Sequence, residues 1–223
     1  MARGMKVFAL VAILVAAGLL MGREAYFYFA VFRPGIAKMI DAAERGDPAM
    51  QTELGMLYQA GGVPRRVSER PALFIHVPPD GSKAFYWYQR AATQGYAKGE
   101  KFLSLAYAGG IGVQRNDPEV VRWMARAANH GDPSAKMMYG RMFDKGYNGV
   151  SRDEVQAVKW YRAAAEAGQV QAQRLLADCY SSGRGVQRDD AQAIAWYAQA
   201  AKQGDAEAQS RVRELEARGQ GAY

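Results

Sequence analysis

The spacing of the tryptophans constrains the fold of this chain more than any other feature of its sequence. The four tryptophans, Trp87, Trp123, Trp160 and Trp196, are separated by 36, 37 and 36 residues. A pair of alanines begins four residues after each of them, and a glycine follows after two variable residues. A fixed period of about 20 to 50 residues is the signature of a repeat architecture, in which stacked copies bury a continuous core. We therefore expect one structural unit, copied along the chain, with the tryptophans in its core.

A second segment recurs in front of each tryptophan. It reads Leu-Gly-Met-Leu-Tyr at residues 54–58 and leads into a glycine-rich turn. Related copies occupy residues 105–113, 139–150 and 176–186, and the copy at 139–150 has one extra residue in its turn. Two segments joined by a turn predict a helix–turn–helix unit.

Cap signals support this interpretation. Asp47, Asp117 and Asp132 each precede a proline, as an N-cap residue precedes a proline at the first helical position. The other second helices are expected to start at Ser82, at Asp153 and at Asp189 or Asp190. The glycine after each alanine pair suits the left-handed residue that ends a helix.

The combined pattern A-x-x-x-L-G-x-x-Y, G-x-G-V and W-Y-x-x-A-A-x-x-G resembles the Sel-one-like repeat family, which is related to the tetratricopeptide repeats. The resemblance covers about residues 35–218, and residues 172–204 fit nearly in full. It implies an all-α fold, an α/α solenoid of about ten helices that form a right-handed superhelix. It implies no cofactor.

This pattern divides the chain into consecutive parts. Residues 35–47 form a half unit, and full units occupy about residues 48–96 (unit one), 97–132 (unit two), 133–169 (unit three) and 170–205 (unit four). Residues 206–218 are expected to form a charged capping helix. Residues 219–223 are expected to be a flexible tail.

The first part, residues 1–34, reads as a membrane segment. Arg3 and Lys6 precede an uncharged apolar run at residues 7–22, as in a secretory signal or a signal anchor. The run reaches roughly 24 Å as a helix, short of a hydrocarbon core of about 30 Å, which favours a cleaved signal. The absence of small residues at suitable positions favours an anchor instead. Aromatic residues at 26–32 suit the membrane interface, and Pro34-Gly35 is expected to break the helix.

Orientation is weakly determined, because the positive charges on the two sides of this segment are nearly equal. The resemblance to a signal anchor favours an N-terminus in the cytoplasm. The expected location is the inner (cytoplasmic) membrane, crossed once, with the solenoid facing the periplasm.

Composition excludes several classes of function. The net charge is +7, yet no dense basic run or nucleic-acid-binding signature accompanies it, so no nucleic acid is expected as a partner. Two histidines and the single Cys179 are too few for a zinc cluster of His and Cys ligands. No nucleophile–base pair or phosphate loop appears, so we expect neither an enzyme nor a small-molecule substrate.

Unit one carries an insertion. The turn valine lies ten residues before the tryptophan in the other units but 24 residues before it in unit one, which places fourteen extra residues within 64–82. The insertion opens with a basic rim that includes Arg65 and Arg66. It continues through Leu73, Phe74, Ile75 and His76, which read as a short extended strand. Insertions of this kind often lie on a binding face, although packing against the solenoid would explain the apolar residues equally well.

Variable positions on the first helix of each unit form the other candidate contact surface. In tetratricopeptide-like arrays these positions line a concave groove, and they pass from apolar to charged along this chain. The candidates are Met56, Gln59, Leu105, Arg141, Asp144, Asp178, Ser181 and Glu214. A simple solvated helix face is the alternative.

The family resemblance implies a membrane-anchored scaffold or adaptor of the bacterial envelope, whose partner is another protein of an envelope complex. A second hypothesis is an immunity protein that binds and neutralises a phospholipase effector of a type VI secretion system. A third class, a peptidoglycan- or glycan-binding module, would show aromatic residues along the groove, and the sequence has none there.

Overall fold

The computed structural model describes residues 33–61 and 79–220, which form an all-helical solenoid. Ten helices lie in these two stretches, which contain no strand. They are α2 (Arg33–Glu44), α3 (Pro48–Ala60), α4 (Gly81–Thr93), α5 (Ala97–Gly109), α6 (Asp117–Asn129), α7 (Pro133–Lys145), α8 (Glu154–Glu166), α9 (Val170–Ser182), α10 (Asp190–Lys202) and α11 (Ala206–Gln220). The predicted membrane segment and strand lie outside the described residues.

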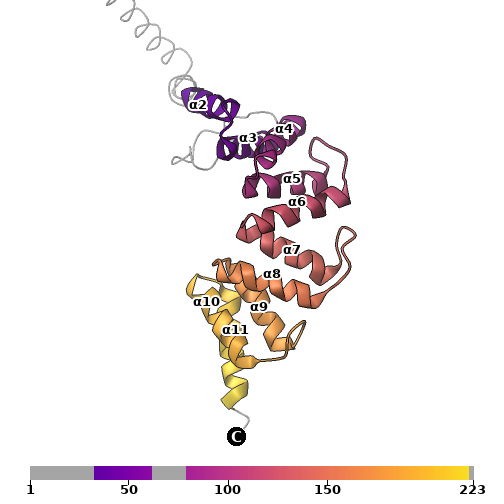
Figure 1. Ribbon diagram of the computed structural model, residues 1–223. Helices are drawn as coiled ribbons and strands as arrows, with labels where there is room; N and C mark the ends of the chain where they lie inside the picture. The colour runs from indigo at the N-terminus through magenta and orange to yellow at the C-terminus, as the bar shows by residue number, and fades with distance from the viewer. Residues whose placement is uncertain (1–32, 62–78, 221–223) are drawn as a thin grey trace, which may run out of the picture.

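Consecutive helices pack on one another in a single curved stack, with α2 at one end and α11 at the other (Figure 1). The first helices of units one to four are α3, α5, α7 and α9, and the second helices are α4, α6, α8 and α10. By sequence, α2 corresponds to the second helix of a unit, and α11 corresponds to the first helix of a unit. The division into a half unit, four full units and a closing helix stays a prediction.

Side-chain caps start four of the six helices whose first residues the sequence predicted. Asp47, Asp132, Asp153 and Asp189 each accept backbone amides of the helix that follows. Two starts were predicted wrongly, because two residues able to cap lie close together in each place. These two starts, the beginning of α2 and the end of α11 differ from the predictions.

At α4 the cap is Asp80, which accepts the Lys83 amide, and Ser82 lies inside the first turn. At α6 the cap is Asn116, which accepts the Glu119 amide, and Asp117 is the first helical residue.

The prediction that Pro34-Gly35 breaks the helix is wrong, because both residues lie in the first turn of α2. Proline is tolerated there because the first amides of a helix have no intrahelical acceptor. At the other end, α11 runs to Gln220, two residues beyond the expected cap.

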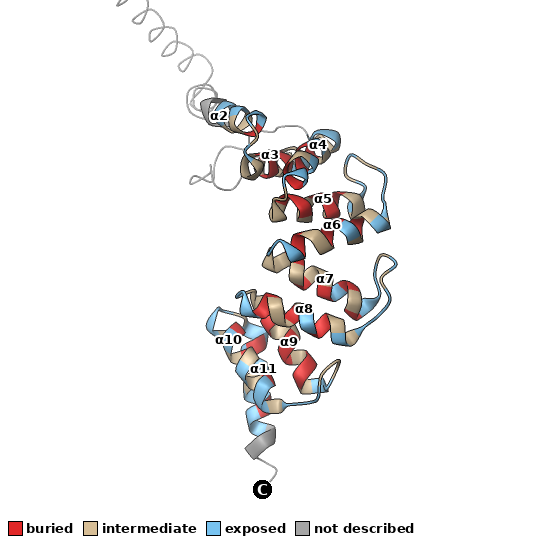
Figure 2. Ribbon diagram, viewed as in Figure 1, coloured by how far each residue is buried: buried red, intermediate tan, exposed pale blue. Residues whose placement is uncertain are grey.

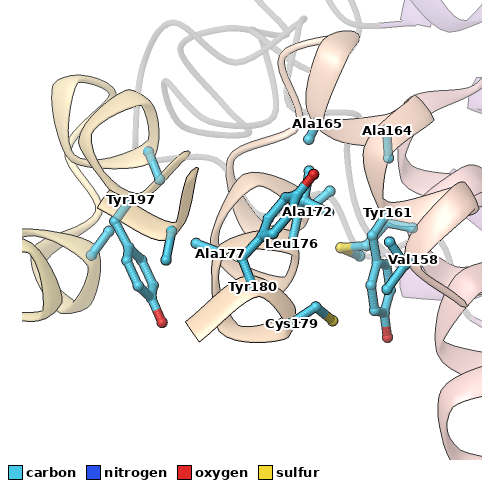
Figure 3. Packing of buried hydrophobic residues seen from close by; sticks show 14 of the residues in the cluster. Val158, Tyr161, Ala164, Ala165, Ala172, Leu176, Ala177, Cys179, Tyr180 and Tyr197 are labelled. Atoms are coloured by element: carbon cyan, nitrogen blue, oxygen red, sulfur yellow. The ribbon is translucent and has the colours of Figure 1, made fainter. Parts of the chain in front are cut away.

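The core of each unit centres on the residue after the tryptophan. Tyr88, Met124 and Tyr161 are 0% exposed, and Tyr197 is 2% exposed. Trp87 and Trp123 are also buried, but Trp160 and Trp196 are only half-buried, so the expectation that all four tryptophans are core was too broad. Buried faces follow the inner sides of successive helices (Figure 2), and in units three and four Leu176 and Cys179 pack between Tyr161 and Tyr197 (Figure 3).

Small residues let these rings approach the first helix. A Cβ atom at Gly55 would lie 2.5 Å from the Tyr88 ring, and one at Gly140 would lie 2.9 Å from the Tyr161 ring. The turns are equally tight. A Cβ atom at Gly185, whose φ is +67°, would lie 2.2 Å from the carbonyl oxygen of Glu154, at the start of α8. Glycine at the second position of G-x-G-V therefore allows the turn of unit four to pack closely against the start of α8 in unit three.

Candidate functional site: the first-helix face

In units one and four, pairs of glutamines connect successive helices through hydrogen bonds. The Gln51 amide donates to the Ala43 carbonyl at 2.9 Å and accepts from Gln94 at 2.8 Å. The same arrangement recurs 122 residues later, where Gln173 donates to the Ala165 carbonyl at 3.2 Å and accepts from Gln203 at 2.8 Å. Each pair joins three successive helices, because one glutamine reaches both the preceding and the following second helix.

Unit two replaces this neutral pair with charges. Glu100 occupies the position of Gln51 and is 0% exposed. Its carboxylate accepts from Arg126 Nε at 2.9 Å and lies 2.7 Å from His130 Nδ1. A buried carboxylate is tolerated only when it is paired and hydrogen-bonded, and this one is. The cluster is therefore a structural element, although its residue types resemble those of a functional site.

The buried tyrosines direct their hydroxyl groups toward the first helices. Tyr88 donates to Gln59 at 2.7 Å, and the Tyr197 hydroxyl bonds to Asp178. Figure 3 shows the hydroxyl groups of Tyr161 and Tyr197 pointing to the same side of the core. Burial raises the pKa of Tyr88 and of Tyr161 far above the ordinary value, so both phenols remain protonated at physiological pH.

The predicted contact residues on the first helices lie at one or both of two positions that are equivalent from helix to helix. We call the surface that they form the first-helix face. In the first half of the solenoid it is largely closed: Met56 packs against the core around Tyr88, Gln59 accepts the Tyr88 hydrogen bond, and Leu105 packs against the core around Met124.

In the second half the same face is charged and hollowed. The Arg141 hollow, of about 380 Å³, lies between α7 and α9 above Tyr161. Its charged lining comprises Arg141, Asp144, Lys145, Arg174, Asp178 and Arg184. The Glu214 hollow, of about 410 Å³, lies between α9 and α11 and is lined by Asp178, Ser181, Ser182, Tyr197, Arg211 and Glu214, among others. Both hollows include Asp178 and Arg184, so they adjoin.

The structure thus brings together Arg141, Asp144 and Asp178 and separates them from Met56, Gln59 and Leu105. The predicted contacts in the insertion, Arg65, Arg66, Leu73, Phe74, Ile75 and His76, lie outside the described residues. Sequence reasoning missed Arg184, which comes from the variable position of a G-x-G-V turn, and Tyr161, which reads as core. Alignment of the turns would have identified Arg184, because it is charged whereas the equivalent positions of the other turns hold the uncharged Ile111 and Tyr147.

Neither metal binding nor a membrane crossing is visible in the described part of the chain. Residues 33–61 and 79–220 contain no group of three or more side chains of His, Cys, Asp or Glu able to hold a metal ion. No helix within the same residues is both long and apolar enough to cross a bilayer. The predicted anchor at residues 7–22 is outside this range.

The fold and this face define a helical-repeat protein of the kind that binds other proteins. Residues 48–70, 75–96, 97–132, 133–169 and 170–205 match the family model described as Sel1 repeat. The chain therefore belongs to the Sel1 repeat family, whose members are protein-interaction scaffolds. The match is interrupted between residues 70 and 75, inside the insertion of unit one.

Two solved structures show the same fold. The protective antigen c5321 of uropathogenic Escherichia coli is 35% identical with a TM-score of 0.71, over 82% of this chain and 36% of that one. A Sel1 repeat protein from Oxalobacter formigenes is 31% identical with a TM-score of 0.69, over 79% of this chain and 48% of that one.

A curated relative covers less of the chain. Chitin synthase regulator SKT5 of Malassezia restricta is 39% identical over 59 residues, which make up 26% of this chain and 4% of that protein. The chain thus spans less than half the length of each of these three relatives.

Proposed function

We propose that this protein is a membrane-anchored scaffold of the bacterial envelope that binds a partner protein on its first-helix face. The observation that carries the proposal is the pair of adjoining hollows along α7, α9 and α11, on a solenoid whose family binds proteins. The two solved structures described above come from bacteria, which supports a bacterial setting.

The anchor and the location rest on the sequence. The apolar run at residues 7–22, flanked by basic residues and followed by an aromatic stretch, supports a single crossing of the inner membrane with the solenoid in the periplasm. Mass spectrometry of the mature protein tests the anchor. A chain that retains residues 1–22 supports it, and a mature start after Gly22 or Ala25 contradicts it.

An affinity pull-down from detergent-solubilised membranes tests the binding role. The bait is the full chain, compared with an Arg141→Glu variant that reverses one charge on the first-helix face. A second variant lacks residues 65–78, a deletion that leaves the Asp80 cap of α4 in place. We expect the wild-type chain to capture a specific protein and Arg141→Glu to capture less of it. Equal capture by wild type and Arg141→Glu would place the binding surface elsewhere.

The deletion assigns a role to the insertion, and the identity of the captured protein separates the two functions that the sequence leaves open. An envelope component supports the scaffold. A phospholipase effector supports the immunity protein.

A further inference from the structure

The Arg141 hollow has more positive than negative charge within reach of a ligand. Four basic side chains and two acidic ones line it. Asp144 is 4% exposed and already holds Arg184 at 3.0 Å and Lys145 at 3.3 Å. Arg174 is held from outside the hollow, by Asp205 at 3.2 Å and Glu207 at 2.6 Å. Asp178 bonds to the Tyr197 hydroxyl.

Arg141 differs from these cations. It is exposed, and within the residues that the structure describes it forms no ion pair or hydrogen bond. A guanidinium presents donors in a planar fork that matches a carboxylate. Arg184 adds further donors to the same hollow, because only its Nη1 engages Asp144 while Nη2 makes a 3.7 Å contact with the Cys179 sulfur.

One polar group at the floor of the Arg141 hollow lacks a hydrogen-bond partner. The Tyr161 hydroxyl is buried and has no partner among the described residues. In unit one the equivalent hydroxyl, on Tyr88, donates to Gln59, and the residue that occupies the position of Gln59 in unit three is Asp144. Arg184 and Lys145 engage Asp144 instead, so Tyr161 is left as a donor without an acceptor. Buried polar groups in native proteins are rarely left in this state without a reason.

We propose that the Arg141 hollow binds a carboxylate of the partner protein, held by Arg141 and Arg184 next to the Tyr161 hydroxyl. The inference rests on the proposed function and specifies it, because it names the chemical group that the partner presents. The carboxylate is an Asp or Glu side chain or a chain terminus.

The test measures peptide binding to the full chain, purified in a non-ionic detergent, by fluorescence anisotropy. Three short labelled peptides are compared: alternating Glu and Ser with an amidated C-terminus, alternating Gln and Ser with an amidated C-terminus, and alternating Gln and Ser with a free C-terminal carboxylate. Binding of the first peptide assigns the site to side-chain carboxylates, and binding of the third assigns it to a terminus. Binding of neither, or equal binding of the amidated Gln peptide, overturns the proposal.

Matched variants locate the site. Arg141→Gln should weaken binding of the acidic peptide about tenfold, the scale of one charge-assisted hydrogen bond. The control Arg122→Gln removes the same charge from an exposed position on α6, where Arg122 pairs with Glu119, and should change binding less than about twofold. Equal weakening by both variants would show general attraction to a basic protein and would overturn the site.

Tyr161→Phe provides a variant that keeps the fold. It removes only a hydroxyl that has no partner, so stability should hold while binding of the acidic peptide weakens about threefold. Unchanged binding by both Tyr161→Phe and Arg141→Gln would overturn the proposal. A wild-type chain that captures a partner from membranes but no acidic peptide would leave the scaffold function intact and remove the carboxylate site. Binding of the acidic peptide without any captured partner would leave the carboxylate site intact and remove the scaffold function.

Discussion

Units one and three share a backbone plan but use the first-helix face differently. In unit one, Met56 packs into the core and Gln59 accepts the hydrogen bond of the buried Tyr88, so the face completes the interior. In unit three, Arg141 and Asp144 occupy the same two positions. Asp144 forms ion pairs with Arg184 and Lys145, and the face contains the Arg141 hollow. The comparison shows that a solenoid can keep one packing scheme and change its surface copy by copy, since each unit contacts mainly its neighbours.

The largest expected effect tests whether the core is the same in both halves. Tyr88→Ala and Tyr161→Ala each remove a ring that is 0% exposed, and each should lower the free energy of unfolding by about 3–5 kcal/mol. Trp160→Ala should cost less than Tyr161→Ala, because Trp160 is only half-buried against Tyr139. Chemical denaturation of the purified variants measures all three. If the Trp160→Ala variant is less stable than the Tyr161→Ala variant, Trp160 and not Tyr161 is the central core residue of unit three.

The second prediction concerns the charged pair of unit two. Glu100→Ala leaves Arg126 and His130 without their carboxylate and should cost about 1–3 kcal/mol, because both partners retain access to water. Glu100→Gln should cost less, since glutamine fills this position in units one and four and can donate to the carbonyl of Ala92 as Gln51 does to that of Ala43. Thermal denaturation at constant pH compares the two. Equal losses would mean that the charge, and not the hydrogen bonding, is what unit two requires.

The third prediction contrasts the two phenols directly. Tyr88→Phe leaves the part-buried Gln59 oxygen without its donor and should cost about 1 kcal/mol. Tyr161→Phe removes a hydroxyl without a partner and should be neutral or slightly stabilising. Differential scanning calorimetry on the pair gives the difference. Equal destabilisation by both changes would show that the Tyr161 hydroxyl has an acceptor, and the contrast between the two halves would then disappear.

Most of the fold was predictable because each signal for helix position recurs in several copies of the repeat. The tryptophan period, the alanine pairs and the aspartates before proline fixed the number and order of the helices. Errors arose where neighbouring residues compete for one role. Asp80 and Ser82 are both good caps, as are Asn116 and Asp117, and only the backbone geometry selects between them.

The site was predictable only in part. The variable positions of the first helices pointed to Arg141, Asp144 and Asp178, but the pattern could not separate them from Met56 and Leu105, which pack inward. Glu100 was missed because a charged residue on a helix reads as solvated, and its partners lie 26 and 30 residues later in the sequence. Comparison of equivalent positions gives the missing signal, since this one holds a buried glutamine in units one and four.

The smallest expected effect lies at the start of α4, directly after the insertion. The Lys83 amide donates to the Asp80 carboxylate at 3.0 Å. This backbone hydrogen bond, together with the smaller effects of the hydrogen bond and charge of the Lys83 side chain, outweighs partial desolvation and lowers the pKa of Asp80 below its ordinary value of 3.8. A carboxyl group with a lowered folded-state pKa stabilises the helix above pH 3.8, and that contribution is lost as the pH falls through the lowered pKa.

The first turn of α4 should therefore fray as the solution becomes more acidic than pH 3.8, which NMR chemical shifts of residues 81–84 would report. Asp80→Asn is the matched control, because asparagine also accepts the Lys83 amide but does not titrate. The variant should keep its first turn across the same range of pH. If Asp80→Asn frays with the same pH dependence as the wild-type chain, another group controls the start of α4. The stability of this end of unit one would then depend on residues beyond the cap.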